Sequence, residues 1–297
     1  MSAWLESLQF VYAPQVVNGL SLGVAVILMA LGLTIIFGLL DVINMAHGEF
    51  YALGAYLGTS LLLTGLSFWL VLVLVPLVML PLGYATERLL IQRVFHHKDR
   101  HILTLLLTFG MAIVLEDVFK LIYGPNSLKP ESPIQGATEL LGMMFPTYRL
   151  FLMAVGLVIL AGVWWVVYRT RLGAIVRAAA YDRHMSASLG VPVLRVYAGT
   201  FAFGVALAGL AGVLLAPVYS VFPTMGKDFI LMAFSVVIVG GLGSIKGAIV
   251  AGLLLTQVQA LSSLYISPVW SDPLVFGIMV LVLMFRPQGL FGRLGHG

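Results

Sequence analysis

Long hydrophobic stretches alternate with short polar segments along almost the whole chain. A helix needs about 20 apolar residues to cross the hydrocarbon core of a membrane. The stretches that meet this length are residues 16–40, 68–91, 102–122, 148–167, 197–221 and 249–266, and shorter ones are 45–63, 229–242 and 269–285. The pattern predicts an all-α, polytopic integral membrane protein with about eight to nine transmembrane helices. The shorter stretches are predicted to be full spans, tilted spans or half-helices that line a cavity.

The composition supports this fold class and restricts the domain organisation. Of 297 residues, 61% are hydrophobic and 9% are charged, whereas a soluble domain carries about 25% charged residues. Residues 1–297 are therefore predicted to form a single transmembrane domain. The chain has no cysteine, which excludes disulfides and thiolate metal sites. Its first 15 residues lack the basic start of a signal peptide, so we expect the first apolar stretch to be retained.

Charged loops predict the orientation of the chain. Segments 88–101 and 169–195 are rich in basic residues, and the tail carries Arg286 and Arg293. By the positive-inside rule these three regions are cytoplasmic. Segment 124–144 has one lysine against two glutamates and is predicted to be external, as is the N-terminus. The net charge of +4 then reflects membrane orientation, and no nucleic-acid partner is expected.

A cluster of polar residues interrupts the hydrophobic pattern in LLDVINMAHGEFYALGAYLG, residues 39–58. Asp41 and Asn44 are good N-cap residues for a helix that begins near Met45, and Glu49 suits its first turns. A capped helix start is one explanation. The other is a helix broken within the membrane, where polar groups face a transport cavity. Asn44, His47 and Glu49 are therefore candidates for a translocation pathway, and no metal site is expected from them.

Other polar residues occur within apolar stretches. Gln257 and Gln259 lie in LTQVQALSSL, where they either line a pathway or form hydrogen bonds between helices; we favour hydrogen bonding and keep both as pathway candidates. Glu116 and Asp117 lie near the outer end of their stretch, and Lys120 is four residues after Glu116. This spacing predicts an ion pair on one helix face.

Glycines at small-residue spacing predict close contacts between helices, because small residues let helix backbones approach in lipid. The GxxxG pairs are Gly19 with Gly23, Gly54 with Gly58, and Gly243 with Gly247.

The segment at residues 169–195 is too polar to span the membrane, yet residues 174–187 favour a helix that Gly190 and Pro192 end. Its small alanine face, at Ala178, Ala179 and Ala180, favours docking into a cytoplasmic partner over insertion into lipid headgroups. A solvated connector is the remaining alternative. The glycine-rich segment GGLGSIKG, at 240–247, lacks the spacing of a nucleotide-binding loop. We therefore expect no cofactor on this chain, and any ATP to be bound by another chain.

Several runs, taken together and in order, resemble the branched-chain amino acid permeases of bacterial ABC importers, the LivH type. They are NGLSLGVAVILMALGLTIIFGLLDVINMAHGEFYALGAYLG, RLGAIVRAAAYDRHMSASLGVPV, FAFGVALAGLAGVLLAP, VIVGGLGSIKGAIVAGLLL and RPQGLFGR. Urea-type permeases are similar. Gly190 is ten residues after Ala180, and so departs from the EAA-spaced glycine of other importer families.

The resemblance implies a multi-pass subunit of the bacterial inner membrane. It also implies a second, LivM-like permease subunit, two ATPases of the LivG and LivF kind, and a periplasmic substrate-binding protein. The segment that couples to the ATPases would include Arg177, Ala178, Ala179, Ala180, Asp182, Ser186 and Gly190.

The function expected is inward transport of branched-chain amino acids or similar small polar solutes by alternating access, with ATP hydrolysed on partner chains and no enzymatic activity here. Urea, amides or aromatic acids are the alternative solutes. An ion-coupled secondary transporter is the first rival, and it would be expected to show buried acids or broken helices in both halves. An intramembrane enzyme using His47 and Glu49 is the second, and no further catalytic motif accompanies these residues.

Overall fold

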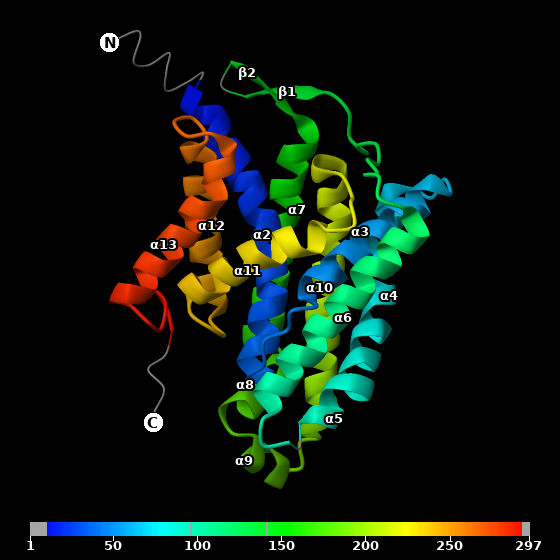
Figure 1. Ribbon diagram of the computed structural model, residues 1–297, viewed down its shortest axis with the longest axis vertical. Coiled ribbons are helices and arrows are strands. Elements are labelled where there is room, and N and C mark those ends of the chain that lie inside the picture. The colour runs from blue at the N-terminus through cyan, green and yellow to red at the C-terminus, as the bar shows by residue number, and fades with distance from the viewer. Residues whose placement is uncertain (1–10, 96, 141, 293–297) are drawn as a thin grey trace.

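The computed structural model describes residues 11–292, apart from residues 96 and 141. The N-terminal ten residues, one histidine of the basic segment 88–101 and Arg293 of the tail therefore lie outside the described part of the chain. That part is a helical bundle with one small β-hairpin (Figure 1). Its elements are α2 (Ala13–Leu40), α3 (His47–Leu63), α4 (Phe68–Thr86), a π-helical segment (Glu87–Ile91), α5 (Gln92–Val94), α6 (Arg100–Tyr123), β1 (Ala137–Leu140), β2 (Met143–Pro146), α7 (Thr147–Arg169), α8 (Arg171–Tyr181), α9 (Arg183–Ser188), α10 (Val193–Tyr219), α11 (Met225–Gly240), α12 (Ile245–Ser262), a 3₁₀ turn (Pro268–Trp270) and α13 (Ser271–Phe285).

Each candidate span of the sequence falls on a helix, which confirms the all-α polytopic fold. Six helices within the described residues are long and apolar enough to cross a membrane, the shortest being α12 with 18 residues. The remaining apolar helices, α3, α11 and α13, have 17, 16 and 15 residues. These are the three segments whose short apolar stretches predicted tilted spans or half-helices.

The two ends of the bundle differ in the way the sequence predicts. Helices α5, α8 and α9 lie together at one end, which brings the basic segments 88–101 and 169–195 to the same side (Figure 1). The β-hairpin lies at the opposite end. It occupies part of the predicted external segment 124–144, and its strands pair antiparallel from Ala137 with Pro146 to Leu140 with Met143. This hairpin is absent from the elements that the sequence predicted.

Helix α4 runs without interruption through the π-helical segment into α5, so that residues 68–94 form one span. Pro76 and Pro81 lie inside it. Membrane helices tolerate proline because neighbouring groups satisfy the freed backbone carbonyls. Helices α2 and α10 occupy the centre: α10 packs against α2, α3 and α4, and α12 packs against α2.

Glycines mark the closest contacts of these central helices. A Cβ atom at Gly54 of α3 would collide with the backbone of Gly209 of α10. One at Gly58 would lie 2.8 Å from Val213 Cγ2, also on α10. On α2, Gly19 and Gly23 face α12 at Gln257 and Thr256. The four positions therefore lie where two helices approach closely.

The last glycine pair is divided between a helix and a turn. Gly247 of α12 faces the backbone of Gly240 of α11. Gly243 lies in the turn before α12 with a φ of +78°, and a Cβ there would be 3.1 Å from Gly38 Cα at the end of α2. Both glycines thus lie at close contacts, as predicted, but Gly243 does so from a left-handed turn and not from a helix.

Candidate functional site

The polar cluster at residues 41–49 lies at a break between helices inside the bundle. Helix α2 ends at Leu40, and its C-cap Asp41 has a φ of +53°. The chain then returns along α2, and α3 begins beside the middle of that helix: His47 Nε2 lies 3.1 Å from the carbonyl oxygen of Met29. Since Met29 is 11 positions before the end of α2, and a helix rises 1.5 Å per residue, α3 starts roughly 16 Å from that end. The break therefore places polar groups at membrane depth.

The residues of the break satisfy backbone groups in a way that differs from the predicted caps. Asn44 Oδ1 accepts a hydrogen bond from the amide of Ala46 at 3.1 Å. The hydroxyl of Thr108 on α6 accepts one from the amide of Met45 at 3.1 Å. Helix α3 begins at His47, close to the predicted start near Met45, but its N-cap is Ala46, so the prediction of Asp41 or Asn44 as the cap is wrong. Asn44 instead closes a turn.

The first turns of α3 and α11 meet at this depth. Gly48 lies against the carbonyl of Gly226, and a Cβ at Gly226 would be 2.5 Å from Glu49 Oε1. Both helix starts carry an acidic residue, Glu49 on α3 and Asp228 on α11. Negative charge is favourable at these positions because the helix amides there point outward without intrahelical partners.

Several polar atoms along α3 are buried without a hydrogen-bond partner among the described residues. Asn44, His47 and Glu49 are at most 1% exposed. The atoms without a partner on α3 are His47 Nδ1, Glu49 Oε2, Tyr51 OH, Tyr56 OH and Thr59 Oγ1. Each such group costs about 1–3 kcal/mol in a closed core. Several such groups on one membrane helix, facing α2, α6 and α11, favour a functional role for some of them.

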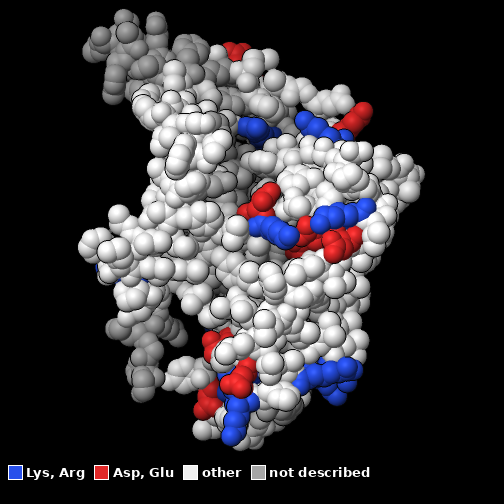
Figure 2. Space-filling view, in the orientation of Figure 1, with Lys and Arg blue, Asp and Glu red and all other residues white. Residues whose placement is uncertain are grey.

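A charged cluster joins α11 to α6 next to Glu49. Glu116 is buried, and its carboxylate forms ion pairs with Lys120 Nζ, at 2.7 Å, and with Lys227 Nζ of α11. Asp117 adds a contact to Lys120 at 3.2 Å. Acidic and basic side chains group together in the middle of the face in Figure 2. The Glu116–Lys120 pair predicted from spacing is present. Lys227 was not among the predicted site residues. The charged pair Lys227 and Asp228, just before the apolar stretch 229–242, could have marked it as a candidate.

The two glutamines of α12 lie in another part of the molecule. Gln257 Nε2 donates a hydrogen bond to the carbonyl of Val16 at 3.0 Å, which joins α12 to α2. Gln259 lines a cavity of about 360 Å³ together with Asn18, Arg149 and Ser263. Arg149 donates to Asn18 Oδ1. The five pathway candidates therefore form two groups, one at the break before α3 and one at the outer ends of α2 and α12.

The predicted coupling segment forms two helices rather than one. Asp182 separates them, because its Oδ1 accepts the amides of His184 and Met185 at 2.8 and 2.9 Å and so caps α9. The expected single helix over residues 174–187 is therefore wrong. Gly190, with a φ of +85°, ends the segment.

Within this segment the alanine face is not uniformly exposed. Ala178 and Ala180 are exposed, whereas Ala179 packs into the bundle with 2% exposure. Arg177 donates to the carbonyl of Val167 and holds α8 against the end of α7, and Ser186 is buried. Large apolar side chains are instead exposed at Leu172, Tyr181, Met185 and Leu189, by 60% or more. We call these four residues the inner apolar patch.

Comparisons with known proteins cover almost the whole chain. The family model described as the permease component of branched-chain amino acid transport systems matches residues 15–283. The high-affinity branched-chain amino acid permease protein BraD of Pseudomonas aeruginosa is 32% identical over 95% of this chain and 96% of its own length. LivH of Escherichia coli K12 is also 32% identical, over 96% and 97%. LivM of Salmonella typhimurium is 30% identical over 89% of this chain and 67% of its own length. No solved structure matches the chain.

Proposed function

This chain belongs to the family of branched-chain amino acid transport permeases, and from that membership we propose that it is the membrane-embedded permease subunit of a bacterial ABC importer. The observation that carries the proposal is the extent of the match, which runs from α2 into α13. The chain is a multi-pass membrane protein, and its place is the inner membrane. Its solutes are branched-chain amino acids, which the names of its relatives specify, or similar small polar solutes.

The partners follow from the same membership. A LivM-like chain is the second permease subunit, since proteins named LivH and LivM both resemble this chain. Two ATPases bind at the inner end, and a periplasmic binding protein delivers solute at the outer end. We infer that ATP is bound by the partner chains, because the glycine-rich segment 240–247 of this chain lacks the spacing of a nucleotide-binding loop.

The inner apolar patch supports a docking role for α8 and α9. Leu172, Tyr181, Met185 and Leu189 project from the end of the bundle that carries the basic segments. Exposed apolar side chains of this size on two neighbouring helices are suited to contact with a protein partner. Ala179 and Arg177 hold the segment on the bundle, so a force on the patch is transmitted to α7 and α10.

Helices α3 and α11 are the candidates for the moving gate. Their first turns meet through Gly48 and Gly226 inside the bundle, beside the buried side chains of His47 and Glu49. Half-helices that meet at membrane depth present backbone amides to polar solutes in other transporters. Tilting of α7 and α10 by the ATPases would separate these two helix starts and change the side to which His47 and Glu49 are open.

The ion-coupled transporter is the rival that one observation favours, namely the buried Glu49 and His47. The other buried acid of this region, Glu116, is paired with two lysines and is thereby suited to a structural role rather than to ion relay.

Uptake into proteoliposomes that contain the purified complex distinguishes the ABC importer from the ion-coupled transporter. The importer proposal expects accumulation of leucine, isoleucine or valine that requires ATP, the binding protein and both ATPases. Uptake that survives removal of the ATPases and stops when the proton or sodium gradient is dissipated would reject it. ATP-dependent uptake of urea or an amide in place of these amino acids would support the ABC importer assignment but would change the transported solute.

A further inference from the structure

A pocket lined by basic side chains opens at the inner end of the molecule, where the connection between α5 and α6 faces α9. Its volume is about 560 Å³. The polar residues that line this basic pocket are His97, Lys98, Arg100, Arg183, His184 and Tyr197. They come from segments that are far apart in the sequence and that the fold brings together. Neither the transport pathway nor the inner apolar patch includes them.

The positive charge of the basic pocket is not neutralised by the described residues. No carboxylate lines it. Arg100 forms an ion pair with Asp41 at 3.9 Å, and that carboxylate is 65% exposed, so the attraction is weak. Asp182, next to Arg183, is used to cap α9. Arg183 Nε instead donates to His184 Nε2 at 3.3 Å. Three cations, Lys98, Arg100 and Arg183, therefore line the pocket with no carboxylate among the lining residues, and together they attract an anion.

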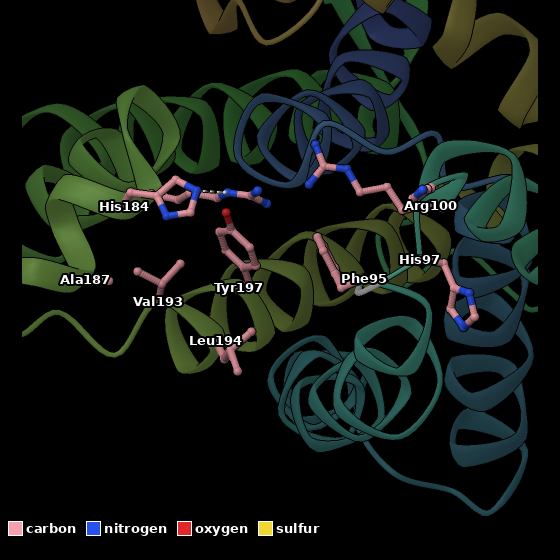
Figure 3. Close-up of a pocket in the computed structure, with 10 residues that line it drawn as sticks. Phe95, His97, Arg100, His184, Ala187, Val193, Leu194 and Tyr197 are labelled. Atoms are coloured by element: carbon pink, nitrogen blue, oxygen red, sulfur yellow. Dashed lines mark hydrogen bonds between the residues drawn. The ribbon is translucent and has the colours of Figure 1, made fainter.

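Two labelled side chains of the pocket point toward a common space. Figure 3 shows Tyr197 and Arg100 extending toward the same space from different helices, while His97 lies at the edge and points away. The positive-inside rule explains why cations lie on this side of the membrane. It does not require them to converge on one hollow, since Arg171 and Arg195 on the same side lie outside the pocket.

Apolar walls complete the pocket and indicate the kind of anion. Phe95, Val193 and Leu194 line it beside the cations, and Leu194 is 49% exposed. On the neighbouring span, Leu89 and Leu90 are also exposed. A site with cations at the cytoplasmic membrane surface and an apolar flank suits a phospholipid headgroup with its glycerol and upper acyl chain. A free anion would gain nothing from the apolar walls.

We propose that the basic pocket binds the phosphate of an anionic phospholipid from the cytoplasmic leaflet, held between Arg100 of α6 and Arg183 of α9. The phosphate then joins a transmembrane helix to the segment that carries the inner apolar patch. Anionic lipid thereby stabilises α9 in its position on the bundle.

The test compares lipid retention by the full complex in nanodiscs of phosphatidylcholine that contain a minor fraction of phosphatidylglycerol. Lipid bound to the complex is measured by native mass spectrometry after release from the disc. The double variant R100Q/R183Q is expected to bind phosphatidylglycerol about thirty-fold more weakly, because each basic side chain near an anionic membrane contributes about five-fold. The matched control is R171Q/R195Q, which removes two cytoplasmic arginines outside the pocket and is expected to retain the lipid.

Further control experiments identify the source of the anion and show whether the variants are correctly folded. Both double variants should melt within a few degrees of the parent complex in phosphatidylcholine alone, and the variant R100K/R183K should recover much of the binding. Millimolar inorganic phosphate should not displace the lipid. Equal loss of lipid in both double variants, or displacement by phosphate, would overturn the proposal. So would unchanged lipid binding accompanied by loss of an ATPase subunit from R100Q/R183Q, because the pocket would then hold an acidic segment of that partner.

Discussion

The central helices α2 and α10 and the outer helices α4, α6 and α7 are all long and strongly apolar, yet they occupy different environments. In the most apolar part of α2 and α10, 83% of the residues are buried, against 28% in each of the outer three spans. Hydrophobicity therefore does not tell a central helix from a lipid-facing one. Small residues do, because lipid tails are as apolar as leucine and only close backbone contact favours one helix neighbour over another.

Glycine positions show the difference most clearly. A Cβ at Gly204 of α10 would lie 2.7 Å from Ile36 Cδ1 of α2, whereas a Cβ at Gly110 of α6 or at Gly162 of α7 meets no atom within 4 Å. Glycine thus has a contact role where its helix faces a neighbour, as at Gly156 of α7, where a Cβ would collide with Val24 of α2, and none where it faces outward.

The substitution G54L gives the largest effect that this comparison predicts. Gly54 of α3 lies on the backbone of Gly209 of α10, and a leucine side chain there would force the two helices apart. We expect a loss of about 3 kcal/mol or more in stability, seen as a strong fall in the melting temperature of the detergent-purified complex. The matched control is G110L on α6, which should melt like the parent. Equal melting of both variants would remove the distinction between central and outer glycines.

The substitution E116Q tests the charged contact between an outer helix and a half-helix. Glu116 is buried on α6 and accepts both Lys120 and Lys227. Loss of its charge leaves two lysines without their shared acid, and we expect a loss of about 2 kcal/mol in the same melting experiment. The control D117N removes a carboxylate that is 62% exposed and should have little effect. A larger effect of D117N than of E116Q would contradict the geometry of the cluster.

The sequence predicted the helices of this molecule better than the contacts between residues that are far apart in the sequence. All spans, the polar break before α3 and the Glu116–Lys120 pair follow from local spacing, because hydrophobic length and helical periodicity are local properties. The contact of Lys227 with Glu116 joins residues 111 positions apart, and no periodic pattern encodes such a contact.

Competition between local signals explains the errors of detail. Asp182 follows a helix-forming alanine run, but its carboxylate caps the next helix and divides the segment. Asn44 bonds to the amide two residues later instead of to the first turn of α3. In the GxxxG pair at Gly243 and Gly247, Gly243 adopts a left-handed turn conformation and lies before the start of α12. Only the assembled backbone decides between such alternatives.

The substitution H47A separates a transport role of the buried polar cluster from a structural one. His47 contacts the Met29 carbonyl and retains a buried nitrogen, Nδ1, without a described partner. We expect initial uptake rates to fall about tenfold, equivalent to about 1.4 kcal/mol, while the yield of assembled complex stays near that of the parent. The exposed residue His101 provides the control H101A. Normal uptake by H47A at normal yield would leave His47 with a role in helix packing alone.

The substitution L157A on α7 is expected to give the smallest effect. Leu157 is 59% exposed and lies on a lipid-facing helix, so truncation changes stability by about 0.5 kcal/mol or less. The matched variant L33A removes a leucine of α2 that is 1% exposed and should cost about 2–5 kcal/mol. Melting curves of both complexes compare the two regions directly, and similar losses would show that the outer helices are buried by a partner over this surface.

Cross-linking from the inner apolar patch tests the central claim, that the chain is a passive conduit driven by ATPases docked on α8 and α9. The chain has no cysteine, so M185C, at a site 60% exposed in the patch, introduces one reactive thiol. M144C, at a site 70% exposed at the opposite end, is the control. With a short bifunctional reagent and the assembled complex in proteoliposomes, the account predicts that M185C cross-links to an ATPase subunit and that M144C does not. Failure of M185C to reach any ATPase, in a complex that still transports, would contradict the account.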